Sequence, residues 1–433
     1  MLSRRRFLGA LSLPVTASAA TALLRPDRAR AVALDLASDS GDPVERASDE
    51  SFWFEVQQAF TADRSLVNLN NGGVSPAPGS VQEAMGRHLA YSNEAPPYTM
   101  WKVLEPQREA VRERLARFFG CQAEEIALTR NASEGLQICQ LGFDFQPGDE
   151  VLTTTQDYPR MITTFQQRER RDGVVLRQFP IPIPSEDPDD VVARFEAGIT
   201  PRTRLILMCH MINITGQILP VRRVVEMARR HGIPVVVDGA HTFAHFPFDR
   251  DSLGCDYYAT SLHKWLFAPH GTGLLYVRRP KIAGLWPMMA APEPMDDDVR
   301  KFEEIGTHPA ANYLAIAEAL TFNLGIGLER KAARMVYLRD RWARRLQEQS
   351  RVRLHTSLAP GFAAGIATFQ VDGVDSMELA DHLWSRHRIL TVAIRHPEFE
   401  GIRVSPSVYT TVEEIDRFAE AVEQVLRGGL PAA

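Results

Sequence analysis

The sequence is short of cysteine, of net charge and of long apolar runs. No CxxC spacing occurs, so neither a disulfide framework nor a metal site is expected, and the cysteines are predicted to be small buried residues: Cys121, Cys139, Cys209 and Cys255. The formal net charge is −5 over 433 residues with both signs interspersed, which argues against a nucleic-acid-binding surface. A chain of this length exceeds what one hydrophobic core usually supports, so two domains are expected.

The N-terminus carries a cluster of arginines followed by a mildly apolar run to Leu24. Ser, Thr and Pro interrupt this run, so it is too weak to span a membrane, and no stable membrane association is expected. The order Ser-Arg-Arg-x-Phe-Leu, beginning at Ser3, is typical of a twin-arginine (Tat) export signal; a basic disordered tail is the alternative. The pattern predicts a signal peptide over residues 1–33, passage through the Tat translocase and a periplasmic location. Residues 34–50 are predicted to be a flexible acidic linker.

The rest of the chain is expected to divide into two domains. Apolar strand patterns alternate with helical patterns across residues 126–277, which predicts a doubly wound, mostly parallel α/β sheet. We place the N-terminal arm and this large domain in residues 51–305. Two helices and a smaller α+β domain are expected in residues 306–433.

Two segments that follow strands organise the large domain. The β-branched run at residues 235–237 ends in Asp238, the pattern of a buried parallel strand that delivers a carboxylate at its carboxyl end. A second strand pattern, at residues 256–260, precedes Lys264, and open parallel sheets bind ligands outside these strand ends. A lysine in an apolar pocket loses its charge easily and reacts with aldehydes, while a nearby Asp keeps a pyridine nitrogen protonated. The pair is the minimum chemistry for pyridoxal 5'-phosphate (PLP); a solvated or salt-bridged pair is the alternative.

Another candidate ligand site is the helix that starts near Ser133, after a short strand. The exposed N–H groups of a helix start, with the Ser133 hydroxyl, suit a phosphate. Ser followed by Glu134 and an apolar run is also common helix-capping chemistry, which is the alternative interpretation. Earlier in the chain, Gly72 and Gly73 allow backbone to approach a ligand closely.

Three motifs occur in the order of a known family: Asp238-Gly239-Ala240-His241, Ser261-x-His263-Lys264 and Gly271-Thr272-Gly273. In these motifs the chain resembles the class V aminotransferase family, from about residue 70 to residue 425. The resemblance implies an α/β protein with the PLP-dependent transferase fold type I. It also implies PLP as the cofactor and a homodimer with sites built between the subunits.

The resemblance further implies a role for each matching residue. Lys264 would hold PLP covalently and then act as the general base, and Asp238 would pair with the pyridinium nitrogen. His241 and Asn213 would approach the ring hydroxyl, and Tyr158 would stack on the ring. The phosphate would be held jointly with Thr307 of the partner subunit by Ala132, Ser133, Ser261 and His263.

A substrate carboxylate would be bound by Arg403, whose guanidinium offers two parallel hydrogen bonds. The resemblance places Asn71, Gly73 and Asn213 on the substrate side of the cofactor. His210 is interpreted either as part of the site or as a core histidine.

Cysteine desulfurases of this family carry a nucleophilic cysteine in the loop that corresponds to residues 395–401. That loop contains no cysteine here, which argues against persulfide chemistry. Arg395, at its start, is either a second substrate contact or half of a surface ion pair.

The expected reaction is transamination, or related tailoring, at the α-carbon and amino group of a small amino acid or peptide-like metabolite. Family members with a similar leader suggest the glutamyl side chain of a pyoverdine-type siderophore as an example. The alternatives are an epimerase like isopenicillin N epimerase, a C–S lyase, and a degenerate binding protein without catalysis.

Overall fold

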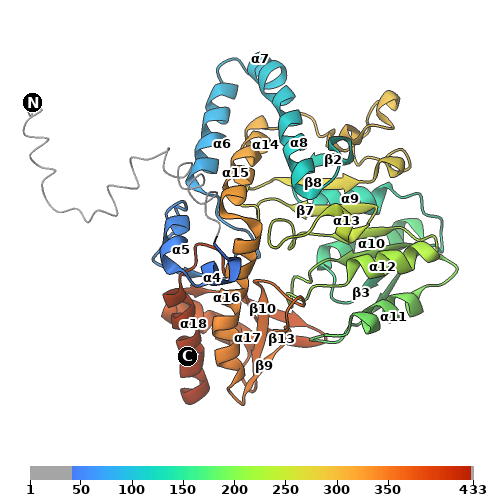
Figure 1. Cartoon of the computed structure of the whole chain (residues 1–433). Coiled ribbons are helices and arrows are strands. Elements are labelled where there is room, and N and C mark those ends of the chain that lie inside the picture. The colour runs from blue at the N-terminus through green and yellow to red at the C-terminus, as the bar shows by residue number, and fades with distance from the viewer. Residues whose placement is uncertain (1–40, 431–433) are drawn as a thin grey trace, which may run out of the picture.

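The computed structural model describes residues 41–430, so the predicted export signal and the first part of the linker lie outside the described residues. Figure 1 shows the large domain in green and yellow beside a smaller domain in orange and red. Within residues 41–430, no helix is both long and apolar enough to cross a membrane.

A seven-stranded sheet forms the large domain. Its strands are β2 (Ile126–Thr129), β3 (Glu150–Thr154), β4 (Val175–Phe179), β5 (Thr203–Cys209), β6 (Val235–Asp238), β7 (Tyr257–Ser261) and β8 (Gly273–Val277). They lie in the order β2-β8-β7-β6-β5-β3-β4, and of these strands β8 is antiparallel to both of its neighbours while the other pairs are parallel. The predicted doubly wound, mostly parallel α/β fold is therefore confirmed.

The central strands of this sheet are buried on both faces, whereas the edge strand β4 is largely exposed. In β6, Val235 and Val237 pack into one hydrophobic cluster, and Val236 packs into another on the opposite face. A strand with no position facing water reads as a continuous apolar run, as parallel sheets between helix layers do. The first face is covered by α8 (Arg108–Phe119), α11 (Pro188–Gly198) and α12 (Val221–Arg230), and the second by α9 (Ala132–Gly142) and α10 (Pro159–Asp172).

The second domain is a four-stranded antiparallel sheet packed against long helices. Its strands are β9 (Val352–Leu354), β10 (Ala367–Val371), β12 (Val392–His396) and β13 (Phe399–Val404), in the order β12-β13-β10-β9. The helices are α16 (Leu328–Gln347), α17 (Ser376–His387) and α18 (Val412–Gly428). The ring of Trp342 lies 5.5 Å from the rings of both Phe369 and Phe418, so α16, β10 and α18 share one core.

Five further helices flank or connect the two larger sheets. They are α6 (Gly79–Ser92), α7 (Pro96–Tyr98), α13 (Arg250–Leu253), α14 (Ala310–Leu314) and α15 (Ile316–Ile326). The segment between α7 and α8 forms π and 3-10 turns at residues 99–107, and the regular α-helix α8 begins only after Pro106. The helices α14 and α15 follow each other with a break at Ala315.

Part of the predicted linker is helical instead of flexible. In α4 (Pro43–Ala47), the Asp42 carboxylate caps the helix by accepting hydrogen bonds from two N–H groups of the first turn. The buried Arg334 of α16 donates to the carbonyl of Ala47 and pairs with Glu50. The prediction from acidic composition was wrong for this segment, because the arginine that holds it lies far away in the sequence.

The N-terminal arm lies against the second domain. The strand β1 (Val67–Asn68) pairs in parallel with β11 (Ile389–Leu390). Trp53, in α5 (Glu50–Gln57), packs in a cluster with Met335 of α16. The strand pairing of this arm is with the smaller domain, whereas Phe60 of the same arm packs on Phe267 of the large domain, with the ring centroids 5.4 Å apart.

The expected loop at residues 395–401 is mostly a β-hairpin. β12 and β13 pair as far as His396 opposite Phe399, which leaves Pro397 and Glu398 as the turn. Glu398 accepts hydrogen bonds from Thr155 and from Gln156, which follow β3 in the large domain. The hairpin thus joins the two domains next to the carboxyl end of the large sheet.

Candidate active site

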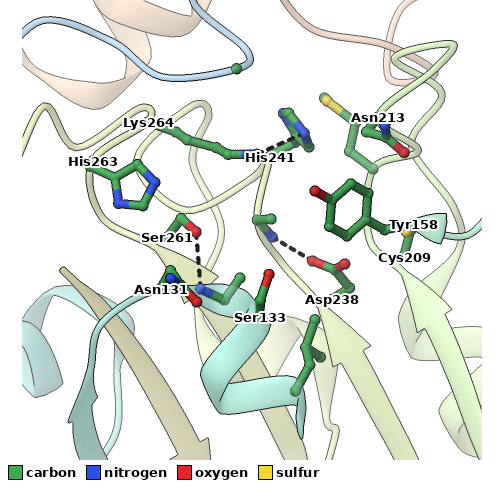
Figure 2. A pocket seen from close by; sticks show the side chains of 15 residues that line it. Asn131, Ser133, Tyr158, Cys209, Asn213, Asp238, His241, Ser261, His263 and Lys264 are labelled. Atoms are coloured by element: carbon green, nitrogen blue, oxygen red, sulfur yellow. Dashed lines mark hydrogen bonds between the residues drawn. The ribbon is translucent and has the colours of Figure 1, made fainter. Parts of the chain in front are cut away.

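A cavity of about 190 Å³ opens at the carboxyl ends of β5, β6 and β7, beside the N-terminus of α9 (Figure 2). Open parallel sheets place their ligand sites at this edge. Most of the residues predicted for the site line this one cavity: Gly73, Ala132, Ser133, Tyr158, Asn213, Asp238, His241, Ser261, His263 and Lys264.

Lys264 and His241 meet inside the cavity. The distance between Lys264 Nζ and His241 Nε2 is 3.1 Å, drawn as a dashed line in Figure 2. Burial lowers the pKa of Lys264 to about 8, against the opposing effect of the Asp238 charge. Burial also holds the pKa of His241 well below its usual value, so the neutral ring accepts a hydrogen bond from the lysine. The site therefore holds an amine that loses its proton close to neutral pH.

Asp238 is the last residue of β6, and its carboxylate lines the same cavity. One carboxylate oxygen accepts a hydrogen bond from the N–H of Ala240 at 2.9 Å. Burial raises the pKa of Asp238 to about 6, while this hydrogen bond and the charge of Lys264 act in the opposite direction. A positive charge brought into the cavity would favour the ionised carboxylate.

The first turn of α9 contributes an anion-binding arrangement. The side-chain oxygen of Asn131 accepts from the N–H of Glu134 at 2.9 Å, so Asn131 is the helix cap and the capping interpretation of Ser133 is wrong. The Ser133 side chain instead lines the cavity. The Ser261 hydroxyl accepts from the N–H of Ala132 at 2.9 Å. A helix N-terminus with two hydroxyl groups beside it suits a phosphate.

His263, Tyr158 and Asn213 complete the cavity wall. His263 Nδ1 lies 3.2 Å from the carbonyl oxygen of Thr272, which accepts its proton and fixes the ring. Tyr158 faces the cavity from the side opposite His263 in Figure 2. The side-chain oxygen of Asn213 and Nδ1 of His241 are buried without a hydrogen-bond partner. Such orphaned polar atoms are costly unless a ligand satisfies them.

Arg403 lies behind this wall. Its Nη1 donates to the carbonyl of Asn213 and its Nη2 to the side-chain oxygen of Asn70, each at 3.0 Å. Its Nε has no partner, and no carboxylate pairs with it among residues 41–430. Burial lowers the pKa of Arg403 to about 10, so the guanidinium is still charged at neutral pH. A buried charge without a counter-ion is costly, and an anion bound here would remove that cost.

Besides Arg403, two residues predicted for the site lie outside the cavity. Asn71 is fully buried, and its amide is bonded to the carbonyl of Ser405 and the hydroxyl of Tyr409. It holds the glycine-rich loop in place, and the prediction that it faces the substrate is not supported by this geometry. Thr307 is exposed and lies outside the cavity of its own chain, so its contact with a second subunit stays a prediction.

The open alternatives for two other residues are decided. His210 is buried edge-on against Phe246 and Phe248, and burial lowers its pKa to about 3, so it is a core histidine. The exposed Arg395 pairs with Asp375 at 2.6 Å, which is a surface ion pair.

Sequence reasoning missed several residues of the cavity wall: Asn131, Leu136, Cys209, Met211 and Ala240. Cys209 ends β5 as Asp238 ends β6, so the strand-end rule was a signal that could have found it. Asp157 lies beside Cys209, and burial raises the pKa of both. No sequence pattern pointed to Asp157.

The residues around the cavity fit PLP. A buried carboxylate for the ring nitrogen, an amine of lowered pKa and an anion-binding helix start lie around one cavity, and two orphaned polar atoms remain to be satisfied. The fold and the site together define a PLP-dependent α/β enzyme of fold type I.

The family assignment rests on nearly the whole chain. The model of the family described as aminotransferase class-V matches residues 67–418. The chain belongs to this family, and its cofactor is PLP.

Two curated relatives are named isopenicillin N epimerase. The protein from Streptomyces clavuligerus is 31% identical over 388 residues, covering 86% of this chain and 98% of the relative. The protein from Amycolatopsis lactamdurans is 32% identical over 396 residues, with the same coverage. Among solved structures, a lysine-to-alanine mutant of C-DES with glycine covalently linked to its PLP is 26% identical, with a TM-score of 0.74, covering 84% of this chain and 98% of that one.

Proposed function

We propose that this protein uses PLP to act at the α-carbon of an amino acid, or of a metabolite that carries one. The observation that carries the proposal is a pair of buried cations: the amine of Lys264, which lines the cavity, and the uncompensated guanidinium of Arg403, which lies behind the cavity wall and donates to Asn213. Their proximity is reflected in electrostatics, since the charge of Arg403 lowers the pKa of Lys264. An α-carboxylate on Arg403 would be held close to the lysine that takes the α-proton.

The residues of the cavity then have distinct roles. Lys264 holds the cofactor and moves the α-proton, and Asp238 keeps the ring nitrogen protonated. His241 accepts a hydrogen bond from the free lysine and orients its amine. The bound cofactor supplies an electron sink for the α-carbon. Ser133, Ser261 and the start of α9 bind the phosphate.

Epimerisation is the reaction that the relatives favour. Two proteins named isopenicillin N epimerase match this chain over almost their entire length. Epimerisation removes the α-proton and returns one to the opposite face, so it needs no second substrate and leaves the amino group in place. Transamination, which the sequence motifs first suggested and after which the family is named, is the second candidate.

One experiment distinguishes these reactions. The PLP-loaded protein is incubated in D₂O with single amino acids and short peptides of either configuration. The products are separated by chiral chromatography, and their masses are measured by mass spectrometry. Epimerisation gives α-deuterated product of both configurations with the amino group retained. Transamination gives an oxo acid and leaves the cofactor as pyridoxamine 5'-phosphate. Sulfide release from cysteine without α-deuteration would replace both proposals by a C–S lyase.

The role of Lys264 has its own test. Borohydride reduction of the loaded protein should leave PLP on the peptide that contains Lys264. Lys264→Ala should fold without forming this adduct, because the amine that attaches the cofactor is gone. A reduced cofactor found on a peptide with another lysine would contradict the role proposed for Lys264.

Location and pathway are proposed from the sequence. We propose export by the Tat translocase and a role in tailoring a peptide metabolite such as a siderophore. Replacing Arg4 and Arg5 by Lys should leave PLP-loaded protein in the cytoplasm, because Tat signals are recognised by the paired arginines. Cell fractionation measures this, and an unchanged periplasmic yield would contradict Tat export.

A further inference from the structure

A second buried lysine lies behind the segment that follows Lys264. Lys331, on α16, is 0% exposed, and within residues 41–430 no carboxylate forms an ion pair with it. Burial holds the pKa of Lys331 well below its usual value. Burying a lysine without a counter-ion costs free energy, so the groups that it contacts indicate its role.

Two of the three contacts of the Lys331 amine are with the segment that follows Lys264, and the third is with Asn323 of α15. Nζ donates a hydrogen bond to the backbone carbonyl of Trp265, the next residue after Lys264. It donates a second to the side-chain oxygen of Asn323 at 2.7 Å. The same ammonium group lies 3.8 Å from the centroid of the Phe267 ring, which is a cation–π contact.

The backbone that these contacts hold is strained. Phe267 has a φ of +60°, a left-handed conformation that bulky side chains rarely adopt. Asn323 donates to the carbonyl of Leu266 at 2.7 Å, so Asn323 and Lys331 together anchor both peptide units before Phe267. A strained conformation persists only where its surroundings over-determine it, and such positions cluster at functional sites.

A similar arrangement holds His241, the residue that Lys264 contacts. Ala244, in the following turn, also has a left-handed φ of +59°. The ring of His245 stacks on that of Trp265, with the centroids 3.9 Å apart. His245 Nε2 accepts a hydrogen bond from the N–H of Gly365 at 3.0 Å. The proton of the His245 ring is therefore on Nδ1, which donates to the carbonyl of His241 at 2.8 Å. Two strained turns are thus clamped on either side of the Lys264–His241 contact.

We propose that Lys331, together with Asn323, is a positioning residue for Lys264. It holds the strained backbone of residues 265–267 so that the amine of Lys264 projects into the cavity toward His241. The inference rests on the proposed role of Lys264 in attaching the cofactor. A lysine that only stabilised the fold would change stability when replaced and would leave the chemistry of Lys264 unaltered.

The test uses cofactor-free, full-length protein and two readouts. Competitive acetylation, followed by mass spectrometry of the Lys264 peptide across a pH series, gives the apparent pKa of the Lys264 amine without any cofactor. Reductive capture of added PLP gives the rate at which Lys264 reacts. Lys331→Met removes the donors while keeping a long side chain. Arg334→Met is the matched control, because Arg334 is equally buried on the same helix but holds Ala47 and Glu50 instead.

Lys331→Met is expected to raise the apparent pKa of Lys264 by about one unit, because a released segment exposes the amine to water. It is also expected to slow PLP capture about tenfold or more, because a small misplacement of a reacting group is costly. Arg334→Met should lower the melting temperature without moving either readout. A folded Lys331→Met protein with an unchanged apparent pKa and capture rate would overturn the proposal.

Asn323→Ala keeps the proposal falsifiable if Lys331→Met does not fold. The same two shifts are expected there, in the same direction, and their absence would equally overturn it. The proposed function fails separately: capture of PLP at another lysine of the wild-type protein would refute the role of Lys264. The acetylation series would still decide whether Lys331 positions the Lys264 amine.

Discussion

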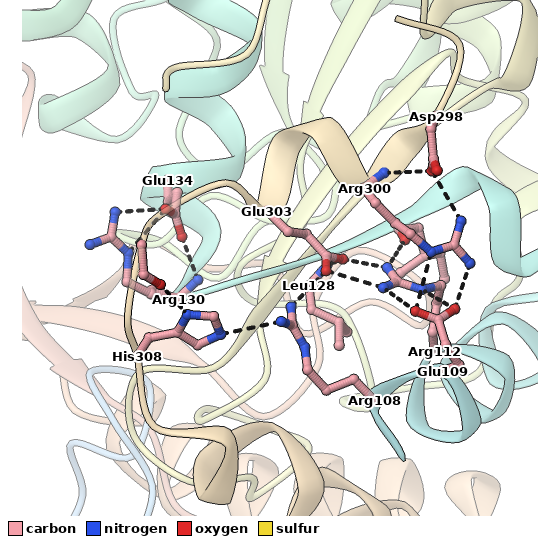
Figure 3. Close-up of polar contacts among 12 residues, drawn as sticks. Arg108, Glu109, Arg112, Leu128, Arg130, Glu134, Asp298, Arg300, Glu303 and His308 are labelled. Atoms are coloured by element: carbon pink, nitrogen blue, oxygen red, sulfur yellow. Dashed lines mark hydrogen bonds and ion pairs between the residues drawn. The ribbon is translucent and has the colours of Figure 1, made fainter. Parts of the chain in front are cut away.

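Two buried arginines of this molecule have opposite surroundings. Arg112 is 1% exposed and forms ion pairs with Glu303 and Glu109 (Figure 3). Burial disfavours its charge, but the hydrogen bonds that Arg112 donates to these carboxylates prevail and raise the pKa of Arg112. Arg403 is 7% exposed and has two neutral oxygen acceptors, and burial lowers its pKa to about 10.

The difference between the two sites lies in the counter-charge. Glu303 also pairs with Arg108 and accepts a hydrogen bond from the N–H of Leu128, each at 2.6 Å, so this network joins α8, β2 and the segment before α14. Every charge in it is compensated, which is typical of a structural site. Arg403 carries an uncompensated charge near a cavity, which is typical of a binding site. Burial alone would not have separated the two arginines.

The largest effect is expected when the compensated network is broken. Glu303→Ala leaves Arg108 and the N–H of Leu128 without their partner, so the free energy of unfolding should fall by about 3–5 kcal/mol. Urea denaturation measures this change. Glu113→Ala is the control, because its ion pair with Arg117 is exposed at 3.9 Å and should contribute about 0–1 kcal/mol. Equal losses in the two variants would contradict the structural role of the network.

The stability of the cofactor-free protein across a pH series tests the lowered pKa of Lys264, the other buried cation of the candidate site. The pKa of Lys264 is about 8 in the folded protein against an ordinary value of 10.5, so the unfolded chain binds more protons between these values. Stability should therefore rise as the pH rises from 8 to 10.5, by up to about 3 kcal/mol from this group. The difference in unfolding free energy between wild type and Lys264→Met isolates the effect. A difference that is independent of pH would contradict the lowered pKa.

The next largest effect is expected in substrate binding, which should depend on Arg403 and distinguish it from the structural Arg112. Arg403→Lys keeps the charge but loses the two-pronged hydrogen bond, so KM should rise by a factor that corresponds to about 1.5–3 kcal/mol. The free energy of unfolding should stay within about 1 kcal/mol of wild type, because the site has no ion pair to lose. Steady-state kinetics and urea denaturation on one preparation check both statements. An unaltered KM for every substrate would contradict the proposed role of Arg403 in substrate binding.

The smallest effect is expected at the start of α9, where Ser133 is compared with Asn131 as a binding residue with a structural one. Ser133→Ala should weaken PLP binding by about 0.5–1.5 kcal/mol, the value of one hydrogen bond, and leave stability unchanged. Asn131→Ala should lower stability by about 1 kcal/mol, because Asn131 is the cap. Equilibrium binding of PLP to the cofactor-free protein and thermal unfolding measure the two effects. A stability loss on Ser133→Ala equal to that on Asn131→Ala would restore the capping interpretation.

Much of the cavity could be predicted because it lies at the ends of strands. Asp238 and Ser261 each end a strand of one parallel sheet, and Lys264 follows within three residues, so the topology of that sheet brings them together. Residues whose surroundings depend on contacts between distant segments were harder to predict from the sequence. Asn71 was expected to face the substrate, but Tyr409 and Ser405 engage its amide. The sequence left a capping role for Ser133 open, because both Asn131 and Ser133 are good capping residues in isolation, and the structure places the cap at Asn131.

The sequence by itself determined the fold class, and it predicted the lysine and the aspartate of the candidate site. These features follow from local hydrophobic patterns and from motifs whose residues are close together in the chain. Only the tertiary structure decided which buried charges are compensated: it gave Arg112 its glutamates, left Arg403 with neutral partners, and brought Lys331 behind Lys264. The physical reason is that the energy of a buried charge depends on the groups around it, and folding brings those groups from distant parts of the chain.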